Sequence, residues 1–473
     1  LFFSGLILAS TFIVMAISHY SPDNAFIARI KSISRLDFGS PAMRLELWKA
    51  SYDAIKKKTL AGYGFDMQSR IFPAYYNQKW AVYETINNLP DRAHNEFIDI
   101  LLTGGLIQLS GYLCLVGFIA ARSFRVILKD RIDRMLCISL LSSVFSYLVA
   151  MLTSFSVHTT ALYFTTILAL LWTMGNNRDE GSQYGSIAIG KFPRLAIVLL
   201  LPFVVFSGVY SVQAYYADHL AMEARISGLE GDYGTMHRLF NEAIELNPGF
   251  DAYRISYLND AIASTEKIDS AQYRQQTLDL LTAIFPDRIA SDDYAMRKAE
   301  ARLKTEKALA GIIEQGDAES AYDALARAYP RIPIVLLEKS KMHMVFNDNE
   351  KAIFELGRLL NDLPDLNDPI LKEHIEHYKE VSDFAAYAHL LSGICHEREG
   401  NLPEAIMEYG KVIELDPYYT DAYLRLSEVH AALKNYEDAL RSLKRVEQFR
   451  GNESGVSERI KELQKMKDDY DRK

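Results

Sequence analysis

The amino-acid sequence predicts an all-α protein: a polytopic bundle of about five transmembrane helices, followed by an α-solenoid of helical repeats. Long apolar stretches are confined to residues 1–216, whereas residues 217–450 consist of polar helical segments joined by short turns. Part of the second region repeats with a period of 34 residues. The first region has a small excess of Lys and Arg, while the remainder is acidic and brings the net charge to −9. The acidic region argues against a nucleic-acid partner, because phosphate binding needs clustered cations.

Five apolar stretches are candidates for membrane spans, each of which takes about twenty residues. They are residues 1–18, 100–121, 135–157, 159–174 and 195–216. The first stretch begins at the first residue without a basic flank, so we expect the sequence to start inside a larger membrane domain.

Basic residues in short loops mark the cytoplasmic side of a membrane protein. The connection after the second stretch carries Arg122, Arg125, Lys129, Arg131 and Arg134. Residues 19–96 are therefore predicted to form a long external loop. Everything after residue 216 is predicted to be external as well.

The external loop contains a predicted helix that begins at Ser40, an N-cap followed by a proline at the first helical position. A buried guanidinium on this helix would need an acidic or phosphate partner. Two interpretations of Arg44 stay open: a salt bridge to Asp37 or Glu46, or a binding site for phosphate. The face predicted to be buried consists of Arg44, Leu47, Trp48, Ser51 and Ile55.

Two further motifs of the loop have both a structural and a functional interpretation. Gly62 and Gly64 flank an aromatic residue, which indicates a tight turn or a backbone site for an anion. His94 and Asn95 stand directly before the second apolar stretch. A histidine there can be an ordinary helix-entry residue or a general acid or base.

The order of these motifs resembles the O-antigen ligase and O-antigen polymerase superfamily over roughly residues 1–175. The family's small or aromatic residue three places after the last glycine is Gln108 here, which is a departure. The motifs are Arg44-x3-Trp48, Gly62-x-Gly64, and His94-Asn95 followed after nine residues by Gly105.

The resemblance implies a multi-pass glycosyltransferase of the bacterial inner (cytoplasmic) membrane. It would move a glycan from an undecaprenyl-diphosphate carrier to a hydroxyl of lipid A-core, of another glycan or of a protein, without a cofactor or a metal. The family also uses an arginine in an earlier external loop, so we expect this sequence to contain only part of the site. The implied roles are catalysis for His94 and Arg44, substrate binding for Asn95, Arg35 and Arg70, and structural support for Trp48, Gly62, Gly64 and Gly105.

Residues 386–449 resemble two tetratricopeptide repeats. We expect a solenoid over residues 217–450, placed in the periplasm by the topology, and a charged helix or tail over 451–473. Such repeats bind protein partners; packing against the chain's own membrane domain is the alternative. For the whole chain, the alternative to an enzyme is a non-catalytic membrane-anchored scaffold of a periplasmic polysaccharide assembly. The positions that match are Gly393, Ala405, Tyr409 and Pro417, then Tyr423, Ser427, Ala439 and Leu443.

Overall fold

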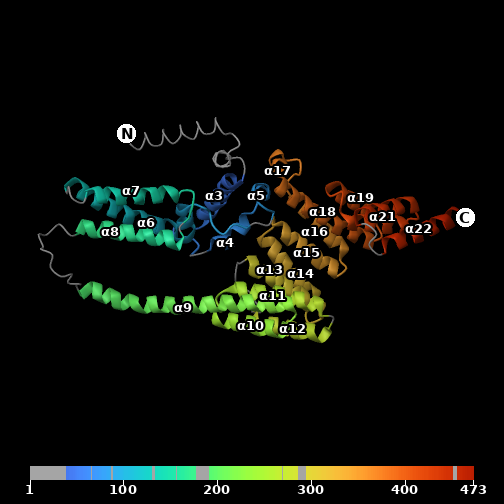
Figure 1. Cartoon of the computed structure of the whole chain (residues 1–473), viewed down its shortest axis with the longest axis horizontal. Coiled ribbons are helices and arrows are strands. Elements are labelled where there is room, and N and C mark those ends of the chain that lie inside the picture. Colours follow the sequence, from blue (N-terminus) through green and yellow to red (C-terminus); the bar gives the residue numbers. More distant parts are fainter. Residues whose placement is uncertain are drawn as a thin grey trace. The chain divides into compact units, whose positions relative to one another are not determined.

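The computed structural model describes residues 39–472, and the predicted all-α class is confirmed there, because this part contains helices and no strand (Figure 1). The predicted span at residues 1–18 and Arg35 lie outside the described residues. The positions left out between 39 and 472 are 65–66, 87–88, 130–133, 156, 177–190, 269, 286–293 and 451–454.

The helices fall into an N-terminal set and a repeat set. The N-terminal set is α3 (Gly39–Lys57), α4 (Gln68–Ile71), η1 (Phe72–Tyr75), α5 (Gln78–Tyr83), α6 (Glu96–Lys129), α7 (Arg134–Ala150) and α8 (His158–Asn176). The repeat set begins with α9 (Lys191–Glu230), α10 (Tyr233–Leu246), α11 (Asp251–Lys267), α12 (Ala271–Ile284), α13 (Tyr294–Leu309) and α14 (Gln315–Ala328). It continues with α15 (Pro333–Val345), α16 (Asn349–Asp362), α17 (Pro369–Glu373), α18 (Ile375–Arg398), α19 (Leu402–Leu415), α20 (Thr420–Ala432), α21 (Tyr436–Arg450) and α22 (Val456–Asp471).

The chain divides into two compact units, which are described separately. The first unit comprises Leu1–Gly117, Val144–Phe164 and Arg331–Lys473, and the second comprises Phe118–Ser143 and Thr165–Pro330. The described part of the external loop and the last group of repeats therefore belong to the same unit.

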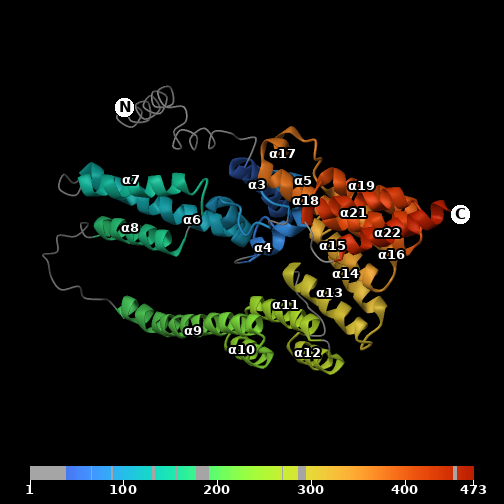
Figure 2. The same ribbon diagram turned by 45° about the vertical axis from the view of Figure 1, so that its right-hand side comes forward.

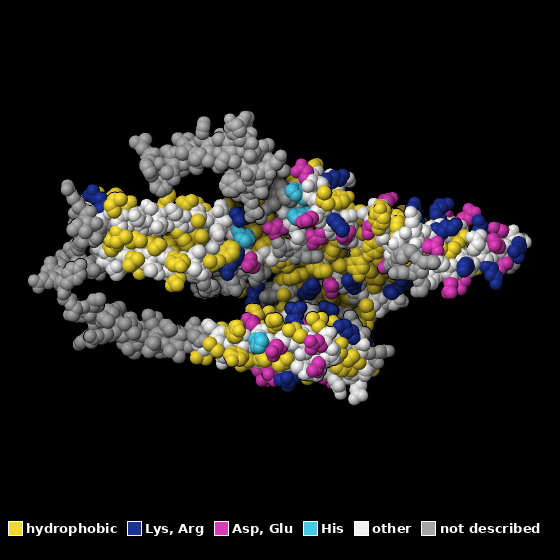
Figure 3. Space-filling model, in the orientation of Figure 1, with side chains coloured by type: hydrophobic (Ala, Val, Ile, Leu, Met, Phe, Trp, Pro, Cys, Tyr) yellow, Lys and Arg dark blue, Asp and Glu magenta, His cyan; other side chains and the backbone are white. Residues whose placement is uncertain are grey.

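Helix α6 is the one described helix that is long and apolar enough to cross a membrane, over Glu96–Leu128. Few of its side chains are buried, and large apolar residues such as Ile107, Leu115 and Phe118 are exposed. Helices α7 and α8 are apolar but shorter. Figure 3 shows hydrophobic side chains spread over the surface of this part of the molecule. One span candidate is thus established among the described residues, and the predicted number of about five is not.

Helix α9 is continuous across residue 216, where the sequence analysis placed a domain boundary. Its C-terminal part carries three buried alanines, which pack in the second unit against α10 and α11. This alanine face supplies the first helix of the earliest repeat, whose sequence pattern is poor because small residues replace large apolar ones. The residues are Ala217, Ala221 and Ala224, in a core with Met236, Phe240 and Tyr257.

The repeats at the C-terminal end follow the predicted pattern closely. Helices α18 and α19 pack side by side, as do α20 and α21 (Figure 2). Gly393 on α18 faces the ring of Tyr409 on α19 so closely that a Cβ would overlap it. The Tyr409 hydroxyl donates to Glu397 at 2.7 Å. The small and aromatic positions of the repeat therefore meet, as the 34-residue period indicates.

Candidate functional site

Helix α3 presents a buried face that is rotated from the predicted one. Leu47 and Ser51 are buried as expected, but the other buried residues of the helix are Ala42, Met43, Glu46, Ala50 and Ala54. Arg44 and Trp48 are only half-buried at its edge. The prediction that Arg44 is buried with the stripe was therefore wrong in degree, because the buried face of α3 is centred on its small and apolar residues and leaves Arg44 at the edge.

Trp48 ties α3 to the backbone just before His94. Its indole Nε1 donates to the Ala93 carbonyl at 2.9 Å, and the Ala93 N–H donates to Asp99 Oδ1 at 3.0 Å. Asp99 lies on the first turns of α6 and is buried. The two hydrogen bonds connect α3, the segment before α6 and α6 itself.

Arg44 does not form the intrahelical salt bridge that was its structural interpretation. The Glu46 carboxylate instead pairs with Lys49 Nζ at 2.6 Å. Asp37, the other candidate partner, lies outside the described residues. Within the described ranges Arg44 forms no ion pair. Its positive charge acts on His94 and lowers the pKa of that residue.

His94 adopts a left-handed backbone conformation, with φ of 53°. Such a conformation is uncommon for a non-glycine residue and is held by the surrounding structure. The imidazole packs on Phe155, with ring centroids 5.5 Å apart. The guanidinium Cζ of Arg92 lies 5.3 Å from the centroid of the same ring. Phe155, from the connection between α7 and α8, therefore brings Arg92 and His94 together.

The charges around His94 favour a neutral imidazole. Burial lowers the pKa of His94, and the positive charges of Arg44 and Arg92 lower it further. The carboxylates of Asp91 and Glu84 act in the opposite direction but do not reverse the shift. His94 is therefore neutral near pH 7, with a cation on α3 in electrostatic reach.

Asn95 is the N-cap of α6. Its Oδ1 accepts the N–H groups of Phe97 at 3.1 Å and Ile98 at 3.2 Å, and its Nδ2 donates to the Leu152 carbonyl at 2.7 Å. The Glu96 N–H donates to two carbonyls of the turn that follows α7. The side chain of Asn95 thus uses both of its polar atoms internally, and the structure gives it the task of fixing the segment that carries His94.

Gly105 breaks α6 and allows the external loop to approach it. Its φ is 64°, and a Cβ there would overlap the backbone of Leu60. The N–H groups of the next two residues, Leu106 and Ile107, donate to the carbonyls of Thr59 and Leu60 at 2.9 and 3.2 Å. Donors that lose their helical partners at the break are thereby satisfied by the loop.

The other side of this junction contains the Gly62-x-Gly64 motif. Gly62 has φ of 63°, and a Cβ on it would overlap the Thr103 backbone. The N–H groups of Tyr63 and Gly64 donate to the carbonyls of Leu102 and Thr103 at 2.7 and 2.8 Å. Because these donors are engaged, the motif forms a tight turn and not an anion site. We call residues 59–64 together with 102–107 the glycine junction.

Gln108, the departure from the family pattern, lies at the same place. Its Oε1 accepts the Thr103 hydroxyl at 3.1 Å, and its side chain covers Gly104. The glutamine thus fills space over a glycine of the junction and satisfies a polar group in an apolar helix.

Arg70 is the last of the predicted site residues to be placed. Arg70 is half-buried on α4. Sequence reasoning did not single out Arg92, Glu84 or Phe155. The available signal for Phe155 was its position in the polar break between two apolar stretches.

In the ranges that the structure describes, no cluster of three or more His, Cys, Asp or Glu side chains could hold a metal ion.

Comparison with known families agrees with both halves of this architecture. Residues 1–116 match the O-antigen ligase family, and residues 397–456 match a tetratricopeptide repeat. The chain joins an O-antigen ligase-type segment to tetratricopeptide repeats. The match to the ligase family includes α3, the glycine junction and His94, whereas Phe155 and Leu152, which contact the site, lie beyond it.

The individual relatives are similar to this chain at lower identity. The Hsp70-Hsp90 organizing protein of Triticum aestivum is 26% identical over 222 residues, which are 44% of this chain and 37% of that protein. Hsp70-Hsp90 organizing protein 3 of Arabidopsis thaliana is 24% identical over 236 residues, 46% of this chain and 40% of that protein. The chain thus spans about two fifths of the length of these relatives.

Among solved structures, similarity is found to YrrB, described as a TPR protein with an unusual peptide-binding site. Identity is 18%, coverage is 47% of this chain and 97% of that one, and the TM-score is 0.29. A tetratricopeptide repeat protein from Parabacteroides merdae is 15% identical, with coverage of 54% and 99% and a TM-score of 0.28.

Proposed function

We propose that the ligase-type segment transfers a glycan from an undecaprenyl-diphosphate carrier to an acceptor hydroxyl at the outer face of the bacterial inner membrane. The observation that carries the proposal is the grouping of Arg44, Arg92 and a neutral His94 directly before the apolar helix α6. In this topology the external loop and the repeats are periplasmic. The acceptor is lipid A-core, another glycan or a protein.

The cations of the site suit the leaving group of this reaction. When the bond between the sugar and the diphosphate oxygen breaks, negative charge develops on the phosphate oxygens and is stabilised by fixed positive groups. Arg44 is half-buried and, among the described residues, has no carboxylate partner, so its guanidinium is available for two parallel hydrogen bonds to phosphate. Arg92 adds a second positive charge that acts on His94.

His94 is suited to accept the proton of the acceptor hydroxyl. Because its pKa is lowered, His94 is mainly in the neutral, basic form at neutral pH. The acceptor oxygen forms the new bond to the anomeric carbon as the bond to the diphosphate breaks, and the hydroxyl proton passes to the imidazole. Asn95 and Trp48 hold the segment that carries His94, as their hydrogen bonds indicate.

Substitution of the two proposed catalytic residues tests the function. Arg44→Ala and His94→Ala in the full-length protein are each expected to reduce the initial rate of glycan transfer by about 10²-fold or more. Arg44→Lys should retain part of the rate, because the charge remains while the bidentate geometry is lost.

The matched control is Lys56→Ala, which removes an exposed cation from the same helix α3. Transfer by this variant should equal that of the wild type. If both Arg44→Ala and His94→Ala transfer at the wild-type rate with normal expression, the enzyme assignment is wrong and the scaffold alternative remains.

A further inference from the structure

The short helix α5 of the external loop is seated on the repeats within the first unit (Figure 1). Ala81 is fully buried and Ile86 is 1% exposed, and both share an apolar core with residues of α15, α16 and α18. Val82 lies in a second apolar cluster with Leu371 of α17 and Val381 of α18. The two clusters bury Ala81, Val82 and Ile86 against the repeats. We call this contact, residues 81–86 together with the repeat residues that they touch, the α5 seat.

Polar contacts fix the register of α5 on this surface. Gln78 Nε2 donates to the Asn361 carbonyl at 3.2 Å, at the end of α16. His377 Nδ1 lies 3.1 Å from the Val82 carbonyl and donates to it in the tautomer that carries a proton there. The Ile86 N–H donates to the Glu380 carboxylate. Each of these contacts satisfies a backbone group at an end of α5 or α16.

The outer side of the same segment contacts the helix that carries Arg44. Trp80 is fully buried and stacks edge-on against Tyr76, with ring centroids 5.6 Å apart. Both α5 and η1 pack on α3, and the ammonium of Lys57 at the end of α3 lies 4.9 Å from the ring centroid of Tyr75. Helix α5 therefore stands between the repeats and α3.

The segment also reaches the site directly. Glu84 caps the C-terminus of α5 and is one of the carboxylates whose charge acts on His94. Tyr83, the last residue of α5, contacts the cluster around Leu371 and lies in electrostatic reach of Lys49 on α3. A displacement of α5 would therefore move Glu84, whose charge acts on His94, and Tyr83, which interacts with Lys49 of α3.

We propose that the repeats bind α5 as an intramolecular ligand and thereby position α3 and Arg44 for the lipid-diphosphate donor. Ala81 and Trp80 are then positioning residues: they act on the reaction through α3 and touch no reacting atom. The part of the inference that concerns transfer rests on the proposed function, whereas the coupling between the α5 seat and α3 does not.

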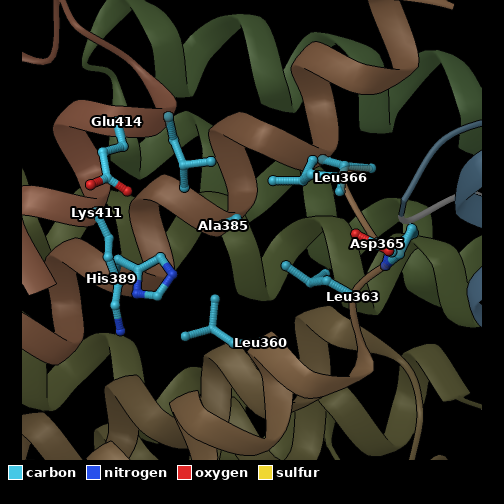
Figure 4. A pocket seen from close by; sticks show the side chains of 11 residues that line it. Leu360, Leu363, Asp365, Leu366, Ala385, His389, Lys411 and Glu414 are labelled. Atoms are coloured by element: carbon cyan, nitrogen blue, oxygen red, sulfur yellow. The ribbon is translucent and has the colours of Figure 1, made fainter. Parts of the chain in front are cut away.

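The surface that holds α5 continues beyond it into a cavity of about 350 Å³. Leu363 and Ala385 line both the cavity and the core around Ala81, and His389 and Lys411 stand at the far end (Figure 4). Both of these far-end groups are held by Glu408, at 2.7 and 2.8 Å. The α5 seat therefore continues into this cavity, and we call the two together the groove.

A matched pair of substitutions separates the buried side of the segment from its exposed side. Ala81→Glu places a carboxylate in the apolar core of the α5 seat, whereas Ala74→Glu makes the same change at an exposed position of η1. Amide hydrogen exchange of the full-length protein in detergent is measured over residues 78–86, over α3, and over α20 and α21.

We expect Ala81→Glu to accelerate exchange in both α5 and α3 by about tenfold or more, while α20 and α21 keep wild-type protection and report folded repeats. The KM for the lipid-diphosphate donor should rise by about tenfold with a smaller change in kcat. Ala74→Glu should match the wild type in all three measurements. Rapid exchange in α5 with unchanged exchange in α3 would overturn the proposed coupling.

Two further measurements keep the test decisive if Ala81→Glu disturbs the repeats themselves. His377→Ala removes the contact with the Val82 carbonyl from a partly exposed position and should change exchange in α5 and α3 in the same direction by a smaller factor. A synthetic peptide with the sequence of residues 72–86 should bind Ala81→Glu protein, whose groove is vacated, and should not bind the wild type. Equal binding to both proteins would show that α5 does not occupy the groove.

The outcomes distinguish this inference from the proposed function. If Arg44→Ala and His94→Ala leave transfer intact while Ala81→Glu loosens α3, the coupling holds and the assignment of the reaction fails. If Arg44→Ala abolishes transfer while Ala81→Glu leaves both α3 exchange and donor KM unchanged, the reaction holds and the coupling fails.

Discussion

The external loop is fixed at two places by opposite means. At the glycine junction, two backbone N–H groups of the loop donate to carbonyls of α6, and two N–H groups of α6 donate to carbonyls of the loop. Side chains are absent at Gly62 and Gly105, where the two backbones approach each other. At the α5 seat, buried side chains such as Ala81 and Ile86 supply the contact, and only a few polar groups set the register. The first contact depends on backbone geometry and the second on apolar area.

The surroundings of each contact explain the difference. The glycine junction lies on α6, the candidate membrane helix, where an unsatisfied backbone group costs several kcal/mol because lipid offers no hydrogen bonds. A break in that helix is tolerated only because the loop carbonyls of Thr59 and Leu60 receive the freed donors. The α5 seat lies among the polar repeat helices, where removal of apolar surface from water is the main source of stability.

Gly105→Ala is expected to have the largest effect of the substitutions that compare the two contacts. The Cβ would overlap the Leu60 backbone, and alanine disfavours φ of 64°, so the junction would separate and lose two hydrogen bonds. Strain and lost bonds together amount to about 5 kcal/mol of the free energy of unfolding. Thermal unfolding in detergent, followed by size-exclusion chromatography, measures the loss.

Gly111→Ala is the control on the same helix, since a Cβ at Gly111 meets nothing within 4 Å and its φ is not positive. It should leave stability unchanged or raise it by a few tenths of a kcal/mol up to about 1 kcal/mol. Equal stability of the two alanine variants would contradict the geometry of the junction.

Substitution of Trp80 addresses the other contact. Trp80→Ala removes the largest fully buried side chain of the loop and should cost about 3–4 kcal/mol. Trp80→Phe should cost less than about 1.5 kcal/mol, because the ring remains and the indole N–H, which has no hydrogen-bond partner within the described residues, is removed. Chemical unfolding followed by circular dichroism compares the variants.

A large loss for Trp80→Phe would mean that the indole N–H is bonded in the protein, and that polar contacts at the α5 seat matter more than area. A small loss for Trp80→Ala would mean that the loop stays attached through the glycine junction alone. Either result would remove the proposed contrast between the two contacts.

The sequence singled out the glycines of the glycine junction, though not the contact between them, whereas it singled out no residue of the α5 seat, and the reason is physical. Gly62, Gly64 and Gly105 are recognisable because a positive φ or a close backbone approach demands glycine, and His94 is recognisable from its place before an apolar stretch. The contact of Ala81 with the repeats joins residues about 280 positions apart, as the Gln78–Asn361 bond shows. The spacing of residues within the loop cannot predict such a contact, because nothing in a short amphipathic segment indicates which distant residues its alanine will contact.

The same contrast applies to the larger architecture. The period of 34 residues predicted α18 to α21, because each repeat must present small and aromatic residues at fixed positions, such as Gly393 and Tyr409. The continuity of α9 through residue 216 was not predicted. Its buried face there consists of alanines, which carry too little apolar volume to signal a helix interface in the sequence.

Asn95 gives a smaller and more local prediction at the glycine-junction end of the loop. Asn95→Ala removes the cap of α6 and the bond to the Leu152 carbonyl, and should cost about 2 kcal/mol. Asn95→Ser keeps an acceptor for the cap but has no donor to reach Leu152, so about half of that loss should return. The same detergent unfolding assay ranks the three proteins; a serine variant as unstable as the alanine variant would show that the Leu152 bond dominates.

The smallest expected effect is a displacement of the pH profile of transfer, and it tests how α3 acts on His94. Burial and then the charge of Arg44 lower the pKa of His94, so the neutral form that accepts the proton is lost only as the pH falls below the usual value of about 6.5. Arg44→Gln removes one of these causes, so the pKa of His94 should rise towards its usual value and the acid limb should move to higher pH. Arg44→Lys keeps the charge and should keep the limb in place. Residual single-turnover rates of the three proteins, measured across the acid range at constant ionic strength, give the limb positions. If the acid limb also moves to higher pH in Ala81→Glu protein, the two contacts are connected, because release of α5 has then carried Arg44 away from His94. If the limb does not move in Arg44→Gln protein, the charge on α3 has no effect on the titration of His94.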